Sequence, residues 1–145
     1  MMGLLMTFLL TDKPERGILV FERMPYWGPE LKRQFSDQSL FVRECRTVGD
    51  LSPSTAEFSD CLVVISLDSA PTDCLTWIGK QSQAIAGPPI IVIGSPEYAE
   101  LEWTVREAGA AAYVNDEIGG RDLARICLRL IRTVRRPPVA APFEG

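Results

Sequence analysis

Apolar residues occur in two kinds of pattern along this chain. In the first kind they follow one another without interruption for four or five positions, as at 61–65 and 90–93. Such runs are typical of strands buried on both faces of a parallel sheet, although a short buried helical segment gives a similar pattern. Three shorter or more mixed runs resemble them and end at polar or turn-forming residues. We therefore predict five strands, at 18–21, 40–45, 61–65, 90–93 and 111–114.

In the second kind, apolar residues recur three or four positions apart, which is the spacing of one face of an α-helix. The clearest series is Leu123, Ile126, Cys127, Leu130 and Ile131. The same spacing, with proline or glycine near the ends, marks three earlier segments. Together these patterns predict helices at 29–35, 71–85, 98–108 and 121–133.

A short additional helix is predicted by capping chemistry. The segment 52–57 reads SPSTAE, in which Ser and Thr are favoured N-cap residues and Glu follows at capping-box spacing. This pattern indicates a helix that ends near Phe58, with Thr47 as an alternative, earlier starting point. Five strands then alternate with five helices.

This alternation predicts an α/β fold with a parallel sheet and helices on both faces. The two wholly apolar strands should be central, and the charges within 40–45 suggest an outer strand. We expect one domain at 18–133. Residues 1–17 are expected to form an arm or an extra strand, and 134–145 a flexible tail rich in proline and alanine.

Composition supports a globular domain, with 46% hydrophobic and 23% charged residues in 145. The net charge of −4 gives no general attraction to nucleic acid or to anionic membranes. The apolar segment 1–10 is too short to span a bilayer and lacks the basic start of a signal peptide. We expect a cytoplasmic protein.

The chain contains four cysteines and no histidine. The cysteines are widely spaced, form no CxxC pair, and are interpreted as reduced core residues: Cys45, Cys61, Cys74 and Cys127. The absence of histidine excludes a histidine general base, histidine metal ligands and phosphohistidine chemistry. No glycine-rich nucleotide-binding motif is present either. The sequence therefore specifies no reaction and no cofactor, and we do not expect an enzyme.

Three segments resemble the response-regulator receiver domain, the CheY-like family with flavodoxin-like topology. REAGAAAYV at 106–114 looks like the family's approach to its fifth strand. PIIVIGS at 89–95 and DCLVVISLDSAP at 60–71 are similar to the segments around its fourth and third strands. The resemblance covers about 18–133 and implies a five-stranded sheet in the order 2-1-3-4-5.

In that family, acidic residues and a phosphoacceptor aspartate hold Mg²⁺, while a Thr or Ser and a Lys contact the phosphoryl group. The resemblance places five matching positions on this chain, with Ile65 or Leu67 as the acceptor position if the register shifts by one. They are Glu22, Arg23, Ser66, Gly94 and Asp116. An arginine thus replaces an acid, the acceptor carboxylate is missing, and an acid replaces the lysine. We interpret the chain as a pseudo-receiver without a bound metal.

Several residues near these positions admit more than one interpretation. Asp68 either accepts a phosphoryl group, or holds a cation with Glu22, or caps the following helix. Ser66 lacks a histidine or lysine partner that would make it a nucleophile. Arg23 either pairs with Asp116 or Glu117, or all of these charges are solvated.

Two aromatic features near the same strand ends also have alternatives. Tyr26 and Trp27 either line a small-molecule pocket or anchor the first helix in the core. Tyr113 matches an aromatic residue that in the family couples the site to a neighbouring face. Gly94, together with the adjacent Ser95, occupies the partner position, and glycine cannot supply the coupling hydroxyl. We therefore expect Tyr113 to be static.

The predicted fourth and last helices carry a candidate interface. Glu100, Trp103 and Glu107 recur opposite the apolar stripe of 98–108, so Trp103 lies off the core face. The last helix carries a stripe of opposite charge, composed of Arg121, Arg125, Arg129 and Arg132. In receiver domains these two helices and the strand that contains Tyr113 commonly mediate dimerisation.

An acidic helix beside a basic helix is self-complementary under a two-fold axis, and Trp and Arg are enriched in interface hot spots. The sequence favours a phosphorylation-independent module that binds a second copy of itself or another signalling protein. The alternative is an atypical receiver that still binds a phosphoryl group or a small ligand at the sheet edge. We expect no nucleic-acid partner, because acidic residues adjoin the arginines.

Overall fold

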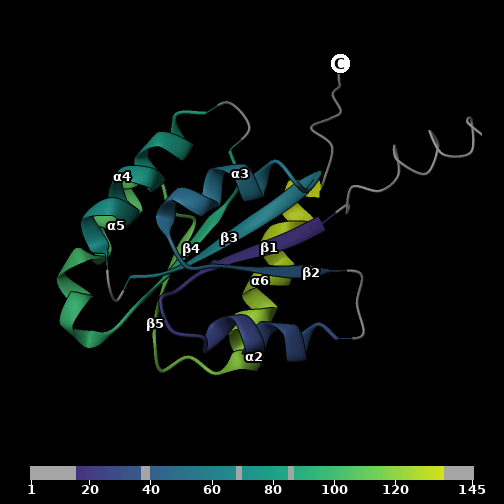
Figure 1. Ribbon diagram of the computed structural model, residues 1–145. Helices are drawn as coiled ribbons and strands as arrows, with labels where there is room; N and C mark the ends of the chain where they lie inside the picture. The colour runs from purple at the N-terminus through teal and green to yellow at the C-terminus, as the bar shows by residue number, and fades with distance from the viewer. Residues whose placement is uncertain (1–15, 37–39, 68–69, 85–86, 136–145) are drawn as a thin grey trace, which may run out of the picture.

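The computed structural model describes residues 16–36, 40–67, 70–84 and 87–135, without the side chains of 132–135. Within these ranges five parallel strands form one sheet in the order β2-β1-β3-β4-β5 (Figure 1). The predicted strand order is confirmed. The strands are β1 (Arg16–Phe21), β2 (Phe41–Cys45), β3 (Asp60–Ser66), β4 (Ile90–Gly94) and β5 (Ala112–Asn115).

Helical segments connect the strands and cover both faces of the sheet. They are α2 (Trp27–Gln34), η1 (Val48–Asp50), α3 (Leu51–Thr55), α4 (Pro71–Ser82), η2 (Pro96–Leu101), α5 (Glu102–Ala108) and α6 (Gly120–Arg135). In Figure 1, α2 and α6 lie on one face, while α3, α4 and α5 lie on the other. The fold is thus a three-layer α/β/α sandwich.

Two apolar clusters fill the spaces between the layers, and strand alternation explains both. Along β1, Ile18 and Val20 belong to the cluster beneath α2 and α6. Leu19 and Phe21, which point to the opposite face, belong to the cluster beneath α3, α4 and α5. A strand buried on both sides must therefore be apolar at every position, which is why 18–21 is an unbroken apolar run.

The strand β3 is at the centre of the sheet. It pairs with β1 on one side and with β4 on the other. Residues 62–65 have no solvent-exposed surface, which explains their unbroken apolar sequence. The charged strand β2 lies at an edge, as predicted, with Arg43 exposed.

The predicted helix at 98–108 is wrong in one respect, because the chain forms the 3-10 helix η2 before the shorter helix α5. A 3-10 helix has three residues per turn, so residues three apart lie on the same side. Tyr98 and Leu101 both pack on the core cluster in this way. Glu100 therefore lies on a different helix from Trp103 and Glu107.

The capping prediction for 52–57 is also wrong. The helix α3 begins at the fully buried Leu51, follows directly on η1, and has no side-chain cap. Instead, the Ser52 hydroxyl accepts a hydrogen bond of 3.0 Å from the indole N–H of Trp77. The earlier start at Thr47 is closer to the structure, because Thr47 immediately precedes η1.

The limits of the predicted domain shift slightly. The first strand starts at Arg16, two residues before the predicted position, and α6 extends to Arg135 instead of ending at 133. Most of the predicted arm at 1–17 and of the predicted tail at 134–145 lies outside the described residues. None of the described helices combines the length and the hydropathy needed to cross a bilayer.

Candidate functional site at the carboxyl edge of the sheet

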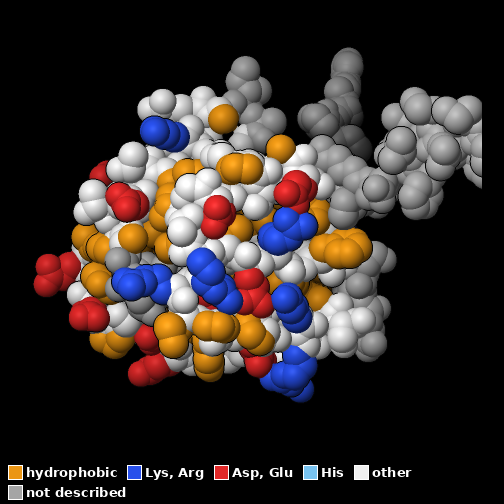
Figure 2. All heavy atoms as spheres, in the orientation of Figure 1, with side chains coloured by type: hydrophobic (Ala, Val, Ile, Leu, Met, Phe, Trp, Pro, Cys, Tyr) orange, Lys and Arg blue, Asp and Glu red, His pale blue; other side chains and the backbone are white. Residues whose placement is uncertain are grey.

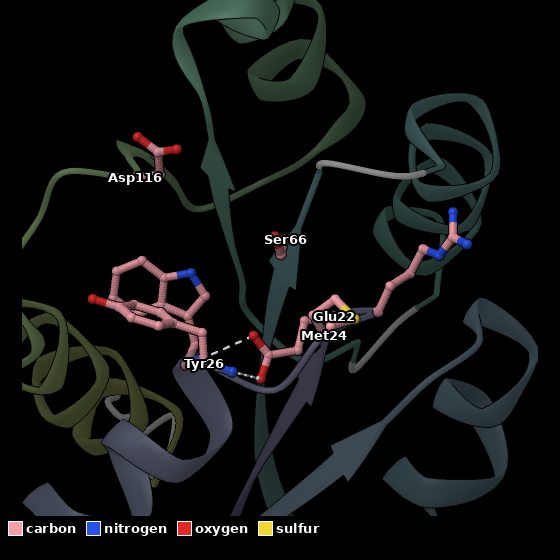
Figure 3. Close-up of a pocket in the computed structure, with 7 residues that line it drawn as sticks. Glu22, Met24, Tyr26, Ser66 and Asp116 are labelled. Atoms are coloured by element: carbon pink, nitrogen blue, oxygen red, sulfur yellow. Dashed lines mark hydrogen bonds between the residues drawn. The ribbon is translucent and has the colours of Figure 1, made fainter.

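A cleft of about 520 Å³ opens at the edge where β1, β3 and β5 end (Figure 3). This is the edge at which ligands bind in open α/β sheets. Four of the five predicted site residues border the cleft, and residues of the loop before α2 complete it. The lining residues are Glu22, Arg23, Met24, Tyr26, Trp27, Ser66 and Asp116.

Glu22, at the position expected for a metal ligand, caps the helix α2. Its side chain is almost completely buried, at 3% exposure. The backbone N–H groups of Tyr26, Trp27 and Gly28 donate to the carboxylate, at 3.0, 2.9 and 2.8 Å. A carboxylate at a helix N-terminus is stabilised by these otherwise unpaired donors and by the helix dipole. Glu22 therefore has a structural role that the sequence did not reveal.

The proposed pairing of Arg23 with an acidic residue of the β5–α6 loop is absent. Arg23 is exposed, and among the ion pairs of the described residues none involves Arg23, Asp116 or Glu117. Instead, backbone N–H groups at the start of the loop donate to acceptors in β4 and β5. The Asp116 N–H donates to the Gly94 carbonyl at 3.0 Å, and the Glu117 N–H donates to the Asn115 side chain at 2.8 Å.

Ser66 ends β3 at the floor of the cleft. It is 6% exposed and lies opposite Ile93 in the parallel register with β4. The next residue, Leu67, extends the pairing, because its N–H donates to the Ile93 carbonyl at 2.9 Å. Asp68, for which we considered phosphoryl, cation and capping roles, lies outside the described residues. Among the described residues, no side chain caps helix α4.

Gly94 and Tyr113 form a close contact beside the cleft. A Cβ atom built on Gly94 would clash with the Tyr113 hydroxyl and would lie 2.6 Å from the ring carbon Cζ. The hydroxyl donates to the Tyr98 carbonyl at 3.2 Å. Burial, with smaller contributions from the charges of Glu102 and Asp116, raises the pKa of Tyr113. The ring thus fills the space that a Thr or Ser side chain would take at position 94.

The chemistry available at this edge is limited. In the described part of the chain, no three Cys, Asp or Glu side chains come together in a way that could hold a metal ion. Arg23 is the single cationic residue among the described residues that line the cleft. A phosphoryl group there would also face the Glu22 and Asp116 carboxylates, and like charges in a partly enclosed space repel.

All four cysteines are buried in the core, and none forms a disulfide. Burial raises the pKa of Cys61 to about 11 and that of Cys127 to about 12. Burial also raises the pKa of Cys74 to about 12. The thiolate is the reactive form of cysteine, so these thiols are unsuited to nucleophilic or redox chemistry at neutral pH.

The candidate interface residues differ in their solvent exposure. Trp103 is 70% exposed, which is unusual for so large an apolar side chain, and Glu100 and Glu107 are exposed as well. Tyr113 is half-buried, and its hydroxyl lies close to Gly94. Three residues of the arginine stripe are exposed on α6: Arg121, Arg125 and Arg129. The fourth, Arg132, has no described side chain.

No family model matches the sequence, and no curated protein matches it either. The backbone, in contrast, is similar to many solved response-regulator structures. The receiver domain of TorR, the response regulator of the TMAO respiratory system, aligns with a TM-score of 0.71 at 17% identity. The alignment covers 82% of this chain and 98% of that one.

Two orphan response regulators are also similar. One, from H. pylori, aligns with a TM-score of 0.67 at 19% identity, over 81% of this chain and 98% of that one. The other is described as an atypical orphan regulator with a phosphorylation-independent mechanism. It aligns with a TM-score of 0.67 at 16% identity, over 80% of this chain and 95% of that one. This chain therefore has the CheY-like fold of response-regulator receiver domains.

Sequence reasoning considered a pocket role for Tyr26 and Trp27 but missed Met24, which also lines the cleft. Met24 and Tyr26 are large, and 77% and 64% exposed. Trp27 is buried at 5% exposure, which supports the prediction of an aromatic anchor for the first helix, and it also borders the cleft. The sequence signal for this part of the cleft was a cluster of large apolar residues in a loop that Pro25 stiffens.

Proposed function

We propose that this chain is a non-enzymatic, receiver-like signalling module that acts without phosphorylation, by binding a second copy of itself. The proposal that the module acts without phosphorylation rests on the altered chemistry at the strand ends. Glu22 caps a helix, Tyr113 occupies the space beside Gly94, and an acid stands at 116. Backbone N–H groups thereby occupy the Glu22 carboxylate, and the Tyr113 ring fills the space of a Thr or Ser side chain. The acid at 116 would repel a phosphoryl group where the family has a lysine.

A receiver that is not regulated by phosphorylation must present its interaction surface permanently. The fixed Tyr113 ring fits this requirement, because the space into which its hydroxyl points is available only next to a glycine. The atypical orphan regulator described above is a structural precedent for phosphorylation-independent regulation on this fold. These two points support a constitutive interaction surface at η2, α5, β5 and α6.

The second part of the proposal rests on Trp103 and the charges around it. Trp103 is the most exposed aromatic side chain of the described residues, and it is accompanied by the exposed acids Glu100 and Glu107. The exposed face of α6 carries arginines. A two-fold axis that places α5 of one copy against α6 of the other would pair opposite charges around a buried tryptophan, a typical hot-spot residue.

Sedimentation velocity tests the dimer. We expect wild type to associate at micromolar concentrations and Trp103→Glu to be monomeric, because the substitution puts a charge into the apolar centre. Phe41→Glu is the matched control, since Phe41 is another exposed aromatic residue, 56% exposed, on the opposite edge strand β2. A wild-type monomer at 200 µM (about the upper end of a practical experiment), or equal loss of association in both variants, would contradict the proposed dimer.

A further inference from the structure

We propose that the cleft at the carboxyl edge of the sheet binds a small organic cation that carries an apolar body, such as an arylammonium or alkylammonium ion. This inference goes beyond the proposed interaction module and does not depend on dimerisation. It follows from an aromatic wall, an unpaired carboxylate and the size of the cleft.

The aromatic wall consists of two rings in contact. The centroids of Tyr26 and Trp27 are 4.7 Å apart and the ring planes are nearly perpendicular, at 88°. Trp27 is anchored in the core, whereas Tyr26 is 64% exposed and borders the cleft. Such an exposed ring offers its electron-rich face to a cation, and Met24 adds an exposed thioether for the apolar body.

The unpaired carboxylate belongs to Asp116. It lines the cleft, and within the described part of the chain it forms no ion pair and accepts no side-chain or backbone hydrogen bond. Figure 3 shows Asp116 and Tyr26 on the same side of the cleft, with Ser66 at the end of β3 facing the space beside them. A carboxylate and an aromatic face that border the same partly enclosed space favour an organic cation.

The other charged groups of the cleft are consistent with a cationic ligand. Glu22 adds a second carboxylate, although three backbone N–H groups already donate to it. Arg23 is exposed, so its long side chain can extend into water, where solvent and salt screen its charge. An anionic ligand would meet two carboxylates. A hard metal ion would need more oxygen ligands than the described lining supplies.

The volume of the cleft is also suitable for a small organic cation. Small-molecule sites typically enclose about 300–1,000 Å³. At about 520 Å³ this cleft has room for a substituted aromatic ring with an ammonium group. Its mixture of a few polar groups and larger apolar ones is the composition expected of such a site.

Titration of the ¹⁵N-labelled full chain with benzyltrimethylammonium tests the proposal. We expect saturable shifts of the amides of Tyr26, Trp27 and Ser66, with a dissociation constant in the millimolar range or tighter. Benzyl alcohol, which is neutral, and benzoate, which is anionic, should bind at least about tenfold more weakly, a difference of about 1.4 kcal/mol.

Two variants with matched controls locate the site. Asp116→Asn should weaken binding about tenfold, whereas Glu117→Gln, the same charge change at the neighbouring exposed residue, should leave it within about twofold. Tyr26→Ala should weaken binding, and Phe41→Ala should not. Benzoate binding as tight as the cation, no saturable shift at 20 mM (about the upper limit for specific binding of this kind), or equal effects of Asp116→Asn and Glu117→Gln would each overturn the proposal.

Discussion

The Tyr113 hydroxyl lies where the side chain of residue 94 would begin, so Gly94 and Tyr113 depend on each other. The hydroxyl donates to the Tyr98 carbonyl at 3.2 Å, which ties β5 to η2 across the end of β4. Any residue larger than glycine at position 94 would displace the ring. The Tyr113 ring thus takes a position that a side chain at residue 94 would obstruct.

Gly94→Ala should destabilise the fold by about 1–3 kcal/mol, because the new methyl group overpacks the Tyr113 ring. The measurement is the free energy of unfolding from urea titration. The control is Gly79→Ala, since Gly79 lies within α4 and a Cβ there meets no atom within 4 Å. The free energy of unfolding of that variant should rise by about 0.5–1 kcal/mol, because alanine has a higher helix propensity than glycine. Equal effects of the two substitutions would contradict the proposed dependence of the Tyr113 position on Gly94.

Glu22→Ala should destabilise the protein by about 2–3 kcal/mol, because three backbone N–H groups at the start of α2 lose a charged acceptor. Glu22→Gln keeps one acceptor oxygen and should cost less. Hydrogen exchange of the Trp27 and Gly28 amides reports the same loss locally. A change in unfolding free energy below about 0.5 kcal/mol for Glu22→Ala would show that the cap is dispensable.

Glu44 should contribute a pH-dependent part of the stability. Figure 2 shows charges of both signs interspersed on the face that carries α2 and β2. There Glu44 contacts Arg46 at 2.6 Å and Lys32 at 2.9 Å. Hydrogen bonds, first from Arg46 and then from Lys32, hold the pKa of Glu44 below its ordinary value of 4.5.

A lowered pKa in the folded state stabilises the fold above the ordinary glutamate pKa and loses this effect as the pH falls through the lowered value. Glu44→Gln should therefore cost about 0.5–1 kcal/mol at pH 7 and progressively less below pH 4.5. Thermal unfolding between pH 3 and pH 7 (about the range that brackets the titration) measures this difference. Glu97→Gln, at an exposed position, is the control. A cost that stays constant with pH would show that these ion pairs do not contribute to stability.

The cysteines should resist thiol reagents in the folded state. Burial raises the pKa of Cys61 to about 11 and the pKa values of Cys74 and Cys127 to about 12, so almost no thiolate forms at pH 8. Labelling with Ellman's reagent should be negligible for native protein and should reach four thiols after denaturation in guanidinium. Rapid native labelling of any of these three cysteines would indicate an exposed thiol.

The resemblance to receiver domains supplied the order of the strands, whereas the sequence pattern itself predicted which strands are central and which lies at an edge, because burial on two faces leaves a strong signal. The unbroken apolar runs at 61–65 and 90–93 became the interior strands β3 and β4, and the charged run at 40–45 became the edge strand β2. Helix boundaries were less predictable. The start of α3 is determined by burial of Leu51, which outweighs the N-cap preference of Ser52.

The candidate site was predicted only in part. Four of the five predicted positions border one cleft, because parallel strands bring their carboxyl ends to one edge. Their contacts could not be predicted, since the hydrogen bonds of Glu22 depend on how the loop 23–26 turns back. Nor could sequence alone show that Arg23 would leave Asp116 unpaired, because long side chains at a solvated edge have many conformations.

The most direct test of the central claim, that this receiver-like fold works without phosphorylation, is a titration of the ¹⁵N-labelled chain with Mg²⁺ and beryllofluoride, a phosphoryl mimic. The positive control is a receiver domain that has the family's phosphoacceptor aspartate and its lysine at the position of Asp116. We predict no saturable shifts at Ser66, Leu67 or Gly94, and no change in self-association. Saturable, Mg²⁺-dependent shifts at these residues would contradict the account.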